Sequence, residues 1–423
     1  MLDIQLFRES PDAIRTALAN RGSDFDIQPI IDLDADRRRV ISEVEGLKAE
    51  RKSASKEIGA IKKAGGDADE AMEAVRKLGD RITELDASCA DIEGRLREQV
   101  LSVPNLPHAS VPVGRTEEDN TLVRTHGEPV ELDFEPKPHW DLADDLGIFE
   151  FDRAARMTGS GFPALRGHGA KLSRALIQFM LDLHTTEHGY TEMAVPFVCN
   201  TEAMTGTGQL PKMQEDMYEI PGDGLWLVPT AEVPLTNLYM TEIIQEPLPI
   251  QITACTPCFR REAGAAGKMT RGMNRVHQFD KVELVRFVKP EESYEHLESL
   301  LGNAEEVLKR LGLHYRVITL CTGDTSFASA KTYDIELWAP GQNTWLEVSS
   351  CSNFEDFQAR RAGIRYRNDE NKTAFIHTLN GSGVALPRLI VAVLENGQNA
   401  DGSIDLPEVL HSYMGGITRL VPS

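Results

Sequence analysis

The chain has 423 residues, which is more than one ordinary hydrophobic core accommodates and predicts two or three domains. Hydrophobic residues make up 41% and charged residues 26% of the sequence, as in globular proteins, and no apolar run approaches the ~20 residues that cross a bilayer. The net charge of −21 argues against nucleic-acid binding by the molecule as a whole, so a surface of that kind must be a local cluster of lysine and arginine.

Targeting signals and cysteine usage both favour the cytoplasm. The N-terminal residues Met1–Gln5 contain neither the basic nor the apolar region of a signal peptide. The six cysteines are scattered along the chain and do not form a disulfide framework. We therefore expect a cytoplasmic protein without a membrane partner.

Two heptad patterns predict a hairpin of long helices at about residues 30–102. Apolar residues recur at alternating three- and four-residue steps, first from Leu33 to Ile61 and then from Val75 to Leu96, which is the pattern of a coiled-coil seam. Two glycines break the pattern between the runs, so the helices must fold back antiparallel. A helix of ~35 residues is roughly 50 Å long.

Proline-rich sequence ends the predicted hairpin near Pro104 and continues to Pro112. We therefore expect an N-terminal domain of residues 1–110 and a second domain of residues 111–423.

The first helix of the hairpin carries a basic cluster on its second half. A solvated coiled-coil face explains most charge runs of this kind, and it is the favoured interpretation when the run is considered alone. A thin arm with a locally basic end also suits an extended polyanion. The residues that we expect to contact nucleic acid are Lys48, Arg51, Lys52 and Lys56.

The second domain mixes helical and strand patterns without regular βαβ alternation, which predicts an antiparallel α+β fold. A helix is expected over Gly169–His184, and strands are expected over Met193–Phe197, Leu225–Val228, Val282–Phe287, Asp334–Trp338 and Trp345–Ser349. The sequence has no GxxxxGK[ST] loop and no GxGxxG after a strand. A bound nucleotide must therefore be held by side chains, chiefly by arginine.

The strongest local signal lies between Phe259 and Glu283. Arg260 follows a predicted strand, a mobile glycine-containing loop comes next, and Phe279 lies on the returning strand. The planar guanidinium fork of arginine matches phosphate oxygens, and an aromatic face allows a base to stack. For either residue alone, a surface arginine or a core phenylalanine is the favoured alternative.

The whole segment closely resembles motif 2 of the class II aminoacyl-tRNA synthetases in its seryl-specific form. Residues 381–388 resemble motif 3 with its arginine, and residues 189–196 resemble motif 1, whose proline lies at the dimer interface in that family. Three further segments are similar to blocks peculiar to the seryl enzymes: residues 230–232, 346–361 and 378–382.

The resemblance covers essentially the full chain. It implies a class II antiparallel sheet flanked by helices, with a coiled-coil arm that grips the long variable arm of serine tRNA. The implied reaction is ATP-dependent activation of L-serine to seryl-adenylate and transfer to the 3′ end of tRNA(Ser), and also to selenocysteine tRNA in a host that has it. The implied assembly is a homodimer, with Pro196 at the interface.

The resemblance also assigns roles to individual residues. Arg260 and Arg388 are implied as the catalytic arginines. The implied ATP-binding set is Arg260, Glu262, Arg275, Val276, Phe279, Glu347, Ser350 and Arg388. The implied serine pocket is Thr230, Glu232, Arg260, Glu283, Asn380 and Ser382.

Magnesium is the metal that the resemblance implies, with Glu347 and Ser350 as its ligands, because oxygen ligands suit that hard cation. Cys255 and Cys258 have the spacing of half a zinc site, but no second pair follows, so we expect no zinc. His184 and His188 stand four residues apart at a helix end, where we expect positive charge to be favoured over a metal.

Three other functions are weighed. Amino-acid:carrier-protein ligases share the catalytic domain but lack the N-terminal arm. A non-catalytic descendant of a synthetase predicts the loss of an essential arginine or carboxylate, yet Arg260, Glu347 and Arg388 are all present. A resistance paralogue with the same activity and a reshaped pocket is also compatible with the sequence, but the housekeeping enzyme is the favoured interpretation.

Overall fold

The computed structural model describes residues 1–263 and 271–422. These residues form two compact units, one of Met1–Ala19 with Ser23–Pro104 and one of Asn20–Gly22 with the chain from Asn105 onward. The loop that we predicted to be mobile, residues 264–270, lies outside the described residues. None of the helices in the described ranges combines the length and the apolar character that a membrane span requires.

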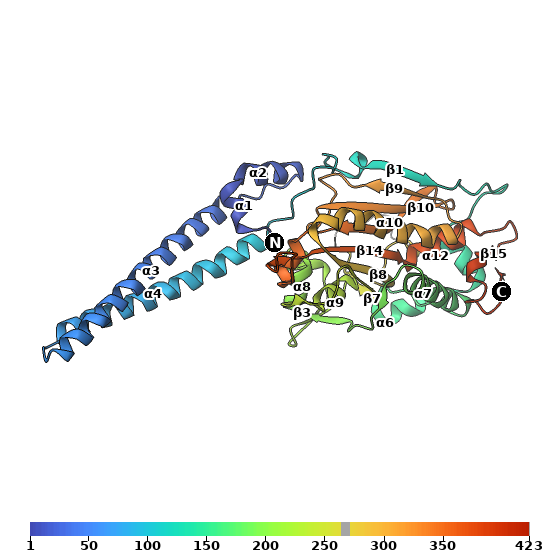
Figure 1. Ribbon diagram of the computed structural model, residues 1–423. Helices are drawn as coiled ribbons and strands as arrows, with labels where there is room; N and C mark the ends of the chain where they lie inside the picture. The colour runs from blue at the N-terminus through green and yellow to red at the C-terminus, as the bar shows by residue number, and fades with distance from the viewer. Residues whose placement is uncertain (264–270, 423) are drawn as a thin grey trace. The chain divides into compact units, whose positions relative to one another are not determined.

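The first unit is helical, and its two long helices form the predicted antiparallel hairpin (Figure 1). Val40 and Val44 of one helix pack against Ile82, Leu85 and Ile92 of the other, so the heptad seam is buried while the outer faces stay in solvent. The predicted coiled-coil arm is confirmed. The helices are α1 (Ile4–Glu9), α2 (Pro11–Asn20), α3 (Gln28–Lys63) and α4 (Asp69–Leu101).

A buried carboxylate explains why the seam of α3 tolerates charge near its beginning. Asp34 is fully buried, and its oxygens lie 3.5 Å from Arg8 Nε, 3.3 Å from Arg37 Nη2 and 3.1 Å from Arg38 Nε. A buried charge is stable only when it is paired in this way. Arg37 therefore ties α3 to its own preceding turn, and its Nη1 lies 3.5 Å from Glu93 of α4.

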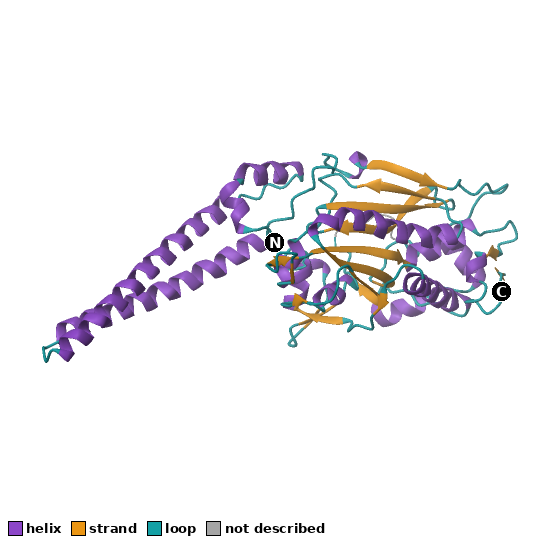
Figure 2. Ribbon diagram, in the orientation of Figure 1, coloured by secondary structure: helices purple, strands orange, loops and turns teal. Residues whose placement is uncertain are grey.

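The second unit is built on an eight-stranded sheet in the described part of the chain (Figure 2). Its neighbouring strands are antiparallel except for the pair at one edge, which is parallel. The antiparallel α+β prediction is confirmed. In spatial order the strands are β1 (Thr121–His126), β9 (Tyr315–Thr319), β10 (Lys331–Ala339), β11 (Thr344–Asn353), β14 (His377–Ala385), β8 (Gln278–Val288), β7 (Ile250–Phe259) and β2 (Thr191–Glu192).

The strand predicted over Met193–Phe197 is wrong. The ladder with β7 ends at Thr191 and Glu192, followed by one hydrogen bond from the Met193 N–H to the Thr253 carbonyl, and the chain next pairs at β3, after Pro196. Proline cannot donate to a ladder, so it interrupts the strand. The short strands are β3 (Val198–Asn200), β4 (Glu219–Ile220), β5 (Leu225–Leu227), β6 (Ile243–Ile244), β12 (Arg365–Arg367), β13 (Thr373–Phe375), β15 (Ile404–Asp405) and β16 (Arg419–Leu420).

The helices of this unit cover the sheet and its margins. The largest core cluster joins three long helices to one face of the sheet, and a second cluster lies against the opposite face of β7 and β8. The helices are α5 (His139–Leu146), α6 (Phe151–Thr158), α7 (His168–Thr186), α8 (Thr201–Thr207), α9 (Glu232–Asn237), α10 (Ser293–Arg310), α11 (Phe357–Ala362) and α12 (Leu386–Asn396).

Strand β8 shows how the sheet separates core from site. Its even-numbered residues Val282 and Leu284 enter the large core with α7, α10 and α12. Successive side chains of a strand point to opposite faces, so Lys281 faces away from that core and lines a cavity. Phe279, near the beginning of the strand, packs against the margin of the core and also lines the cavity.

Close packing of α10 on β14 predicts a measurable coupling between Leu300 and Gly381. A Cβ at Gly381 would collide with the Leu300 side chain and lie 3.0 Å from Cys351 Sγ. We expect Gly381→Ala to lower the free energy of unfolding by about 1–3 kcal/mol and Leu300→Ala by about 2–5 kcal/mol. Because Leu300→Ala removes the clash, the double variant should lose about 1 kcal/mol less than the sum.

Urea unfolding followed by tryptophan fluorescence measures this cycle, because all four tryptophans belong to the second unit. Strict additivity of the two single effects would contradict the packing described for α10 and β14.

Candidate active site

A cavity of about 630 Å³ gathers almost all the predicted site residues of the second domain. They come from six separate stretches of chain, which the sheet and its neighbouring loops bring together. Those that line the cavity are Thr230, Glu232, Arg260, Glu262, Arg275, Val276, Phe279, Glu347, Ser350, Asn380, Ser382 and Arg388.

Glu283 lies just behind the cavity wall and is fully buried. Its Oε2 accepts from Thr230 Oγ1 at 3.3 Å and lies 2.6 Å from Lys281 Nζ, while its Oε1 accepts from Asn380 Nδ2 at 2.9 Å. Ser382 is its cross-strand partner on β14. Hydrogen bonds to residues of the wall thus connect this buried carboxylate to the cavity.

Two β-bulges decide which residues face the cavity. On β11 the register shifts so that Ile335 pairs with Ser349 and Glu336 with Glu347, which leaves Val348 as an extra residue. Residues three apart on a regular strand point to opposite faces, but the extra residue puts Glu347 and Ser350 on the same face.

The second bulge lies on β14, between Ser382 and Ala385. Val384 there has φ of 107°, a conformation that a β-branched residue adopts only under strain. The bulge keeps Ser382 and Ala385 on the cavity side and leads directly into α12, where Arg388 lies in the first turn.

Arg260 is held at the end of β7 by contacts on several sides. Its Nε donates to the Pro229 carbonyl at 3.2 Å, and its guanidinium lies 5.4 Å from the Phe279 ring centre. His277 contacts the Arg260 carbonyl through Nδ1 at 2.9 Å, so that nitrogen must be the donor. His277 therefore supports the backbone of Arg260.

Two further arginines reach the cavity with part of their hydrogen-bonding capacity satisfied by the protein. Arg388 donates from Nε to the Asn274 carbonyl at 3.1 Å and from Nη1 to the Glu347 carbonyl at 2.6 Å. Arg275 Nη1 donates to Glu262 Oε2 at 2.9 Å. A guanidinium has five N–H donors, so both arginines retain donors for an anion.

Two buried carboxyl groups, Glu232 in the cavity wall and Asp334 opposite Ser350 on the neighbouring strand, have raised pKa values. Burial, and then the negative charge of Glu283, raise the pKa of Glu232 to about 7, although Gln358 Nε2 donates to its Oε1 at 2.6 Å. Burial and then Glu347 hold the pKa of Asp334 well above its usual range. Perturbed carboxyl groups beside a cavity are typical of functional sites.

The residues considered for magnesium and for zinc differ in their donor atoms and in their burial. Glu347 and Ser350 offer oxygen atoms on one face of the cavity, which is the donor chemistry that Mg²⁺ prefers. Burial raises the pKa of Cys255 to about 12 and also raises that of Cys258, so both thiols are protonated at neutral pH. In the described ranges no three His, Cys, Asp or Glu residues are grouped to hold a metal.

The positive charge expected at His184 and His188 is wrong for His184. This residue is fully buried, and burial lowers its pKa to about 3, so it is neutral. Its Nδ1 lies 2.9 Å from Nδ1 of His188, so the two rings share one hydrogen bond.

The remaining predicted residues lie elsewhere. In the first unit, Lys48, Arg51, Lys52 and Lys56 are exposed and surround one surface hollow of α3, with Lys48 Nζ 3.2 Å from Asp86 of α4. In the second unit, Pro196 is exposed beside Phe197, whose residue surface is 48% accessible.

Sequence reasoning missed Lys281 and Gln358. Lys281 lies two residues from both Phe279 and Glu283 on β8, so the two-residue period of a strand places it on the site face. That signal could have found it. Gln358, which holds Glu232, is on the short helix α11, and no local pattern indicates where its side chain points.

Known proteins provide an independent comparison. Residues 217–397 match the family described as the tRNA synthetase class II core domain (G, H, P, S and T), and residues 1–107 match the Seryl-tRNA synthetase N-terminal domain. A serine–tRNA ligase of Syntrophobacter fumaroxidans is 54% identical over 99% of this chain and 100% of its own length.

Two solved structures are similar over the full length. The seryl-tRNA synthetase of Pyrococcus horikoshii, in a complex with ATP, has a TM-score of 0.94 and 38% identity, with 100% of each chain covered. The cytoplasmic serine–tRNA ligase of Naegleria fowleri, in a complex with AMP, has a TM-score of 0.88 and 30% identity, with 100% of this chain and 99% of that chain covered.

The setting of Glu232 predicts a carboxyl group that titrates near neutrality. We expect carbon-13 NMR of carboxyl-labelled glutamate to show one signal with a pKa of about 7 that disappears in Glu232→Gln. Gln358→Leu removes a hydrogen bond to the ionised form and should raise this pKa further. The absence of any glutamate signal that titrates above its ordinary range would contradict this description of the pocket.

Proposed function

Since this chain belongs to the family of seryl-tRNA synthetases, we propose that its cavity is where serine reacts with ATP and where the seryl group passes to tRNA. The chain is an enzyme that activates L-serine to seryl-adenylate and transfers it to the 3′ end of tRNA(Ser). The observation that carries the proposed site is the meeting of three arginines from separate chain segments with a small polar pocket around Glu283.

Activation of serine needs positioning and charge neutralisation more than a general base. The α-carboxyl group is ionised at neutral pH, since its ordinary pKa is ~3.5, and one of its oxygens attacks the α-phosphorus of ATP directly. The new bond between carboxylate and phosphorus forms as the bond to the β-phosphate breaks and pyrophosphate leaves. Negative charge then accumulates around phosphorus. Arg260, at the end of β7, would neutralise this charge and hold the serine carboxylate, and its contacts to Pro229 and Phe279 orient it for that role.

The remaining ATP contacts follow from the cavity wall. Arg275 and Arg388 would hold the γ-phosphate, because both present free guanidinium donors beside the Glu347 face. Phe279 would stack on adenine, with Val276 beside it and Glu262 accepting from the adenine amino group. Arg275 Nη1 donates to Glu262 Oε2 at 2.9 Å, so in this proposal the γ-phosphate lies close to the adenine amino group.

The pocket around Glu283 would select serine. We assign the ammonium group to Thr230 and Glu232, because the ionised form of Glu232 attracts a cation in a buried setting. The hydroxyl group would hydrogen-bond with Glu283 and Ser382, with Asn380 holding Glu283 in place. Alanine lacks this hydroxyl group, so its binding would leave buried polar groups of the pocket without a hydrogen-bond partner. Such a site rejects alanine strongly.

Magnesium fits the same wall. Glu347 and Ser350 would hold Mg²⁺, because the bulge at Val348 turns both oxygen donors to the cavity. The ion, when bound, would neutralise charge on the phosphate oxygens. Serine and the adenine base would be bound and oriented by residues of the protein, without the ion.

The N-terminal arm and the assembly complete the proposal. The exposed cations Lys48, Arg51, Lys52 and Lys56 would contact the phosphates of the long variable arm of tRNA(Ser). We propose a cytoplasmic homodimer with Pro196 at the interface, supported by the exposed Phe197 beside it.

Pyrophosphate exchange into ATP with each of the twenty standard amino acids tests the reaction. We expect exchange with serine alone, and a decrease of at least about 100-fold in kcat/KM for Arg260→Ala, because electrostatic stabilisation by one aimed donor contributes ~10²–10³. Arg261→Ala is the matched control, since its Nε instead donates to the Met217 carbonyl outside the proposed ATP contacts. Exchange with another amino acid, or none with any, would contradict the proposed pocket.

The arm makes a separate prediction. Replacing Lys48, Arg51, Lys52 and Lys56 together by alanine should leave serine-dependent exchange unchanged and weaken charging of tRNA(Ser) by about tenfold or more. The slope of log affinity against log salt should also become shallower by about 0.9 for each tRNA phosphate that the variant no longer neutralises.

A control variant changes the same number of arm cations, at Arg39, Arg76, Lys77 and Arg95. If both variants weaken tRNA charging equally, the cluster on α3 has no special role.

A further inference from the structure

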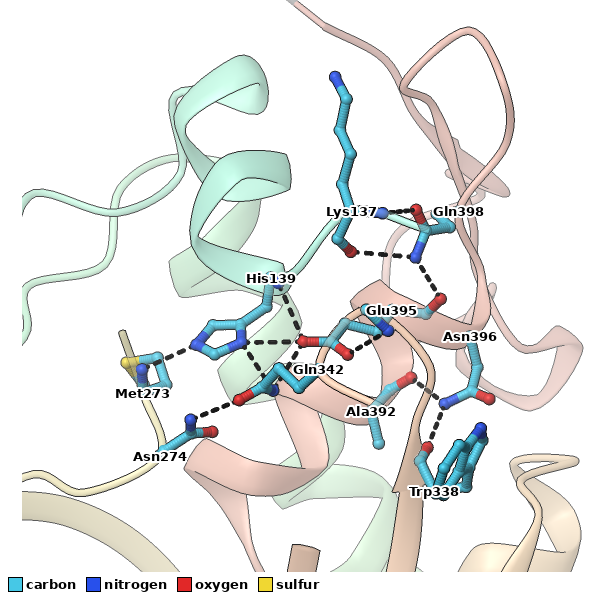
Figure 3. A network of polar contacts seen from close by, with 11 residues as sticks. Lys137, His139, Met273, Asn274, Trp338, Gln342, Ala392, Glu395, Asn396 and Gln398 are labelled. Carbon is cyan, nitrogen blue, oxygen red and sulfur yellow. Dashed lines mark hydrogen bonds and ion pairs between the residues drawn. The ribbon is translucent and has the colours of Figure 1, made fainter. Parts of the chain in front are cut away.

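A buried polar network connects His139 and Glu395 with Met273 and Asn274, the two residues that precede Arg275 (Figure 3). We propose that His139 and Glu395 are positioning residues that hold residues 272–275 so that Arg275 and Arg388 face the phosphates of ATP. This inference rests on the proposed function for the assignment of the phosphates. Neither His139 nor Glu395 lines the cavity, and both side chains are fully inaccessible.

Glu395, in the last turn of α12, is the centre of the network. Its Oε1 accepts from the His139 backbone N–H at 3.0 Å, from His139 Nδ1 at 3.0 Å and from Gln342 Nε2 at 2.8 Å. Its Oε2 accepts from the Gly341 backbone N–H at 2.9 Å. The carboxylate thereby ties the start of α5 and the turn between β10 and β11 to α12, the helix that begins beside Arg388.

The hydrogen bonds of His139 determine its tautomer. Nε2 accepts from the Met273 backbone N–H at 3.0 Å, so it cannot carry a proton. The proton must then lie on Nδ1, which donates to Glu395. Gln342 Nε2 lies 3.3 Å from Nδ1 because both are donors to the same carboxylate oxygen. Glu395 orients the imidazole, and the imidazole in turn holds Met273.

The network continues from Met273 to both arginines. Asn274 Nδ2 donates to Gln342 Oε1 at 2.6 Å, and the Asn274 carbonyl accepts from Arg388 Nε at 3.1 Å. Arg275 is the next residue and lines the cavity. A displacement of Met273 and Asn274 would therefore move both arginines, whereas Thr230, Glu232 and Glu283 are held by other contacts.

Gly272 shows how closely the segment approaches the imidazole. Its φ is +69°, and a Cβ there would collide with His139 Nε2. Only glycine combines this backbone conformation with this approach. Contact with the imidazole thus fixes the turn that leads into Met273.

Two substitutions of His139 separate positioning from packing. Glutamine places an acceptor oxygen near the position of Nε2, and asparagine places a donor near the position of Nδ1. We expect His139→Gln to retain ATP affinity to within about threefold and His139→Asn to weaken it by about tenfold, because the Met273 N–H loses its acceptor. The KM for serine should change by less than about twofold in both, since the serine pocket is held independently.

The measurements are the dissociation constant of MgATP for the full-length protein by calorimetry, together with the KM values for ATP and serine in pyrophosphate exchange. Asn396→Ala is the control, because it removes a hydrogen bond from the same helix end to the Trp338 carbonyl and should leave ATP affinity unchanged. If His139→Asn fails to fold, Gln342→Met, at a partly exposed position, should show the same weakening for ATP alone.

Equal weakening of ATP and serine binding, or a greater weakening of ATP binding in His139→Gln than in His139→Asn, would overturn the inference. Unchanged ATP affinity in Gln342→Met would do so as well. These results are distinct from failure of the proposed function, because a wild-type protein that binds MgATP but shows no serine-dependent exchange would contradict the reaction and leave the ATP comparison intact.

Discussion

The site depends on the register of three neighbouring strands, β11, β14 and β8. Glu283 lies opposite Ser382, and one extra residue on each of β11 and β14 turns Glu347, Ser350 and Ala385 to the cavity. A shift of one residue moves every side chain of a strand to the other face, so the same sequence without these bulges would bury part of the site. The strain at Val384, with φ of 107°, is tolerated because the large core behind β14 holds the strand in place.

The framework around the cavity also holds three arginines in place. Each is anchored mainly by carbonyl oxygens or a single carboxylate, and each keeps guanidinium donors that point into the cavity. These anchors come from the framework, so little reorganisation is needed when an anion binds. The network of His139 and Glu395 lies behind the cavity wall and holds the backbone segment that carries Arg275 and contacts Arg388.

Much of this organisation was predictable from the sequence, because long heptad runs, strand patterns and linked motifs are local signals. The coiled-coil arm and the antiparallel fold are confirmed, and twelve predicted site residues line a single cavity. The bulge at Val348 and the network of His139 with Glu395 were not predictable, because each depends on contacts between residues far apart in sequence. Lys281 was overlooked despite a usable strand period, and the charge state of His184 depends on burial, which its helix position does not reveal.

The central claim is that one cavity holds serine against Glu283 and ATP against the three arginines. A crystal structure with a non-hydrolysable sulfamoyl analogue of seryl-adenylate tests it most directly. We expect the seryl hydroxyl group within hydrogen-bonding distance of Glu283 or Ser382, the ammonium group beside Glu232, and the adenine ring on Phe279. An analogue bound with its seryl group away from Glu283, or bound outside this cavity, would contradict the account.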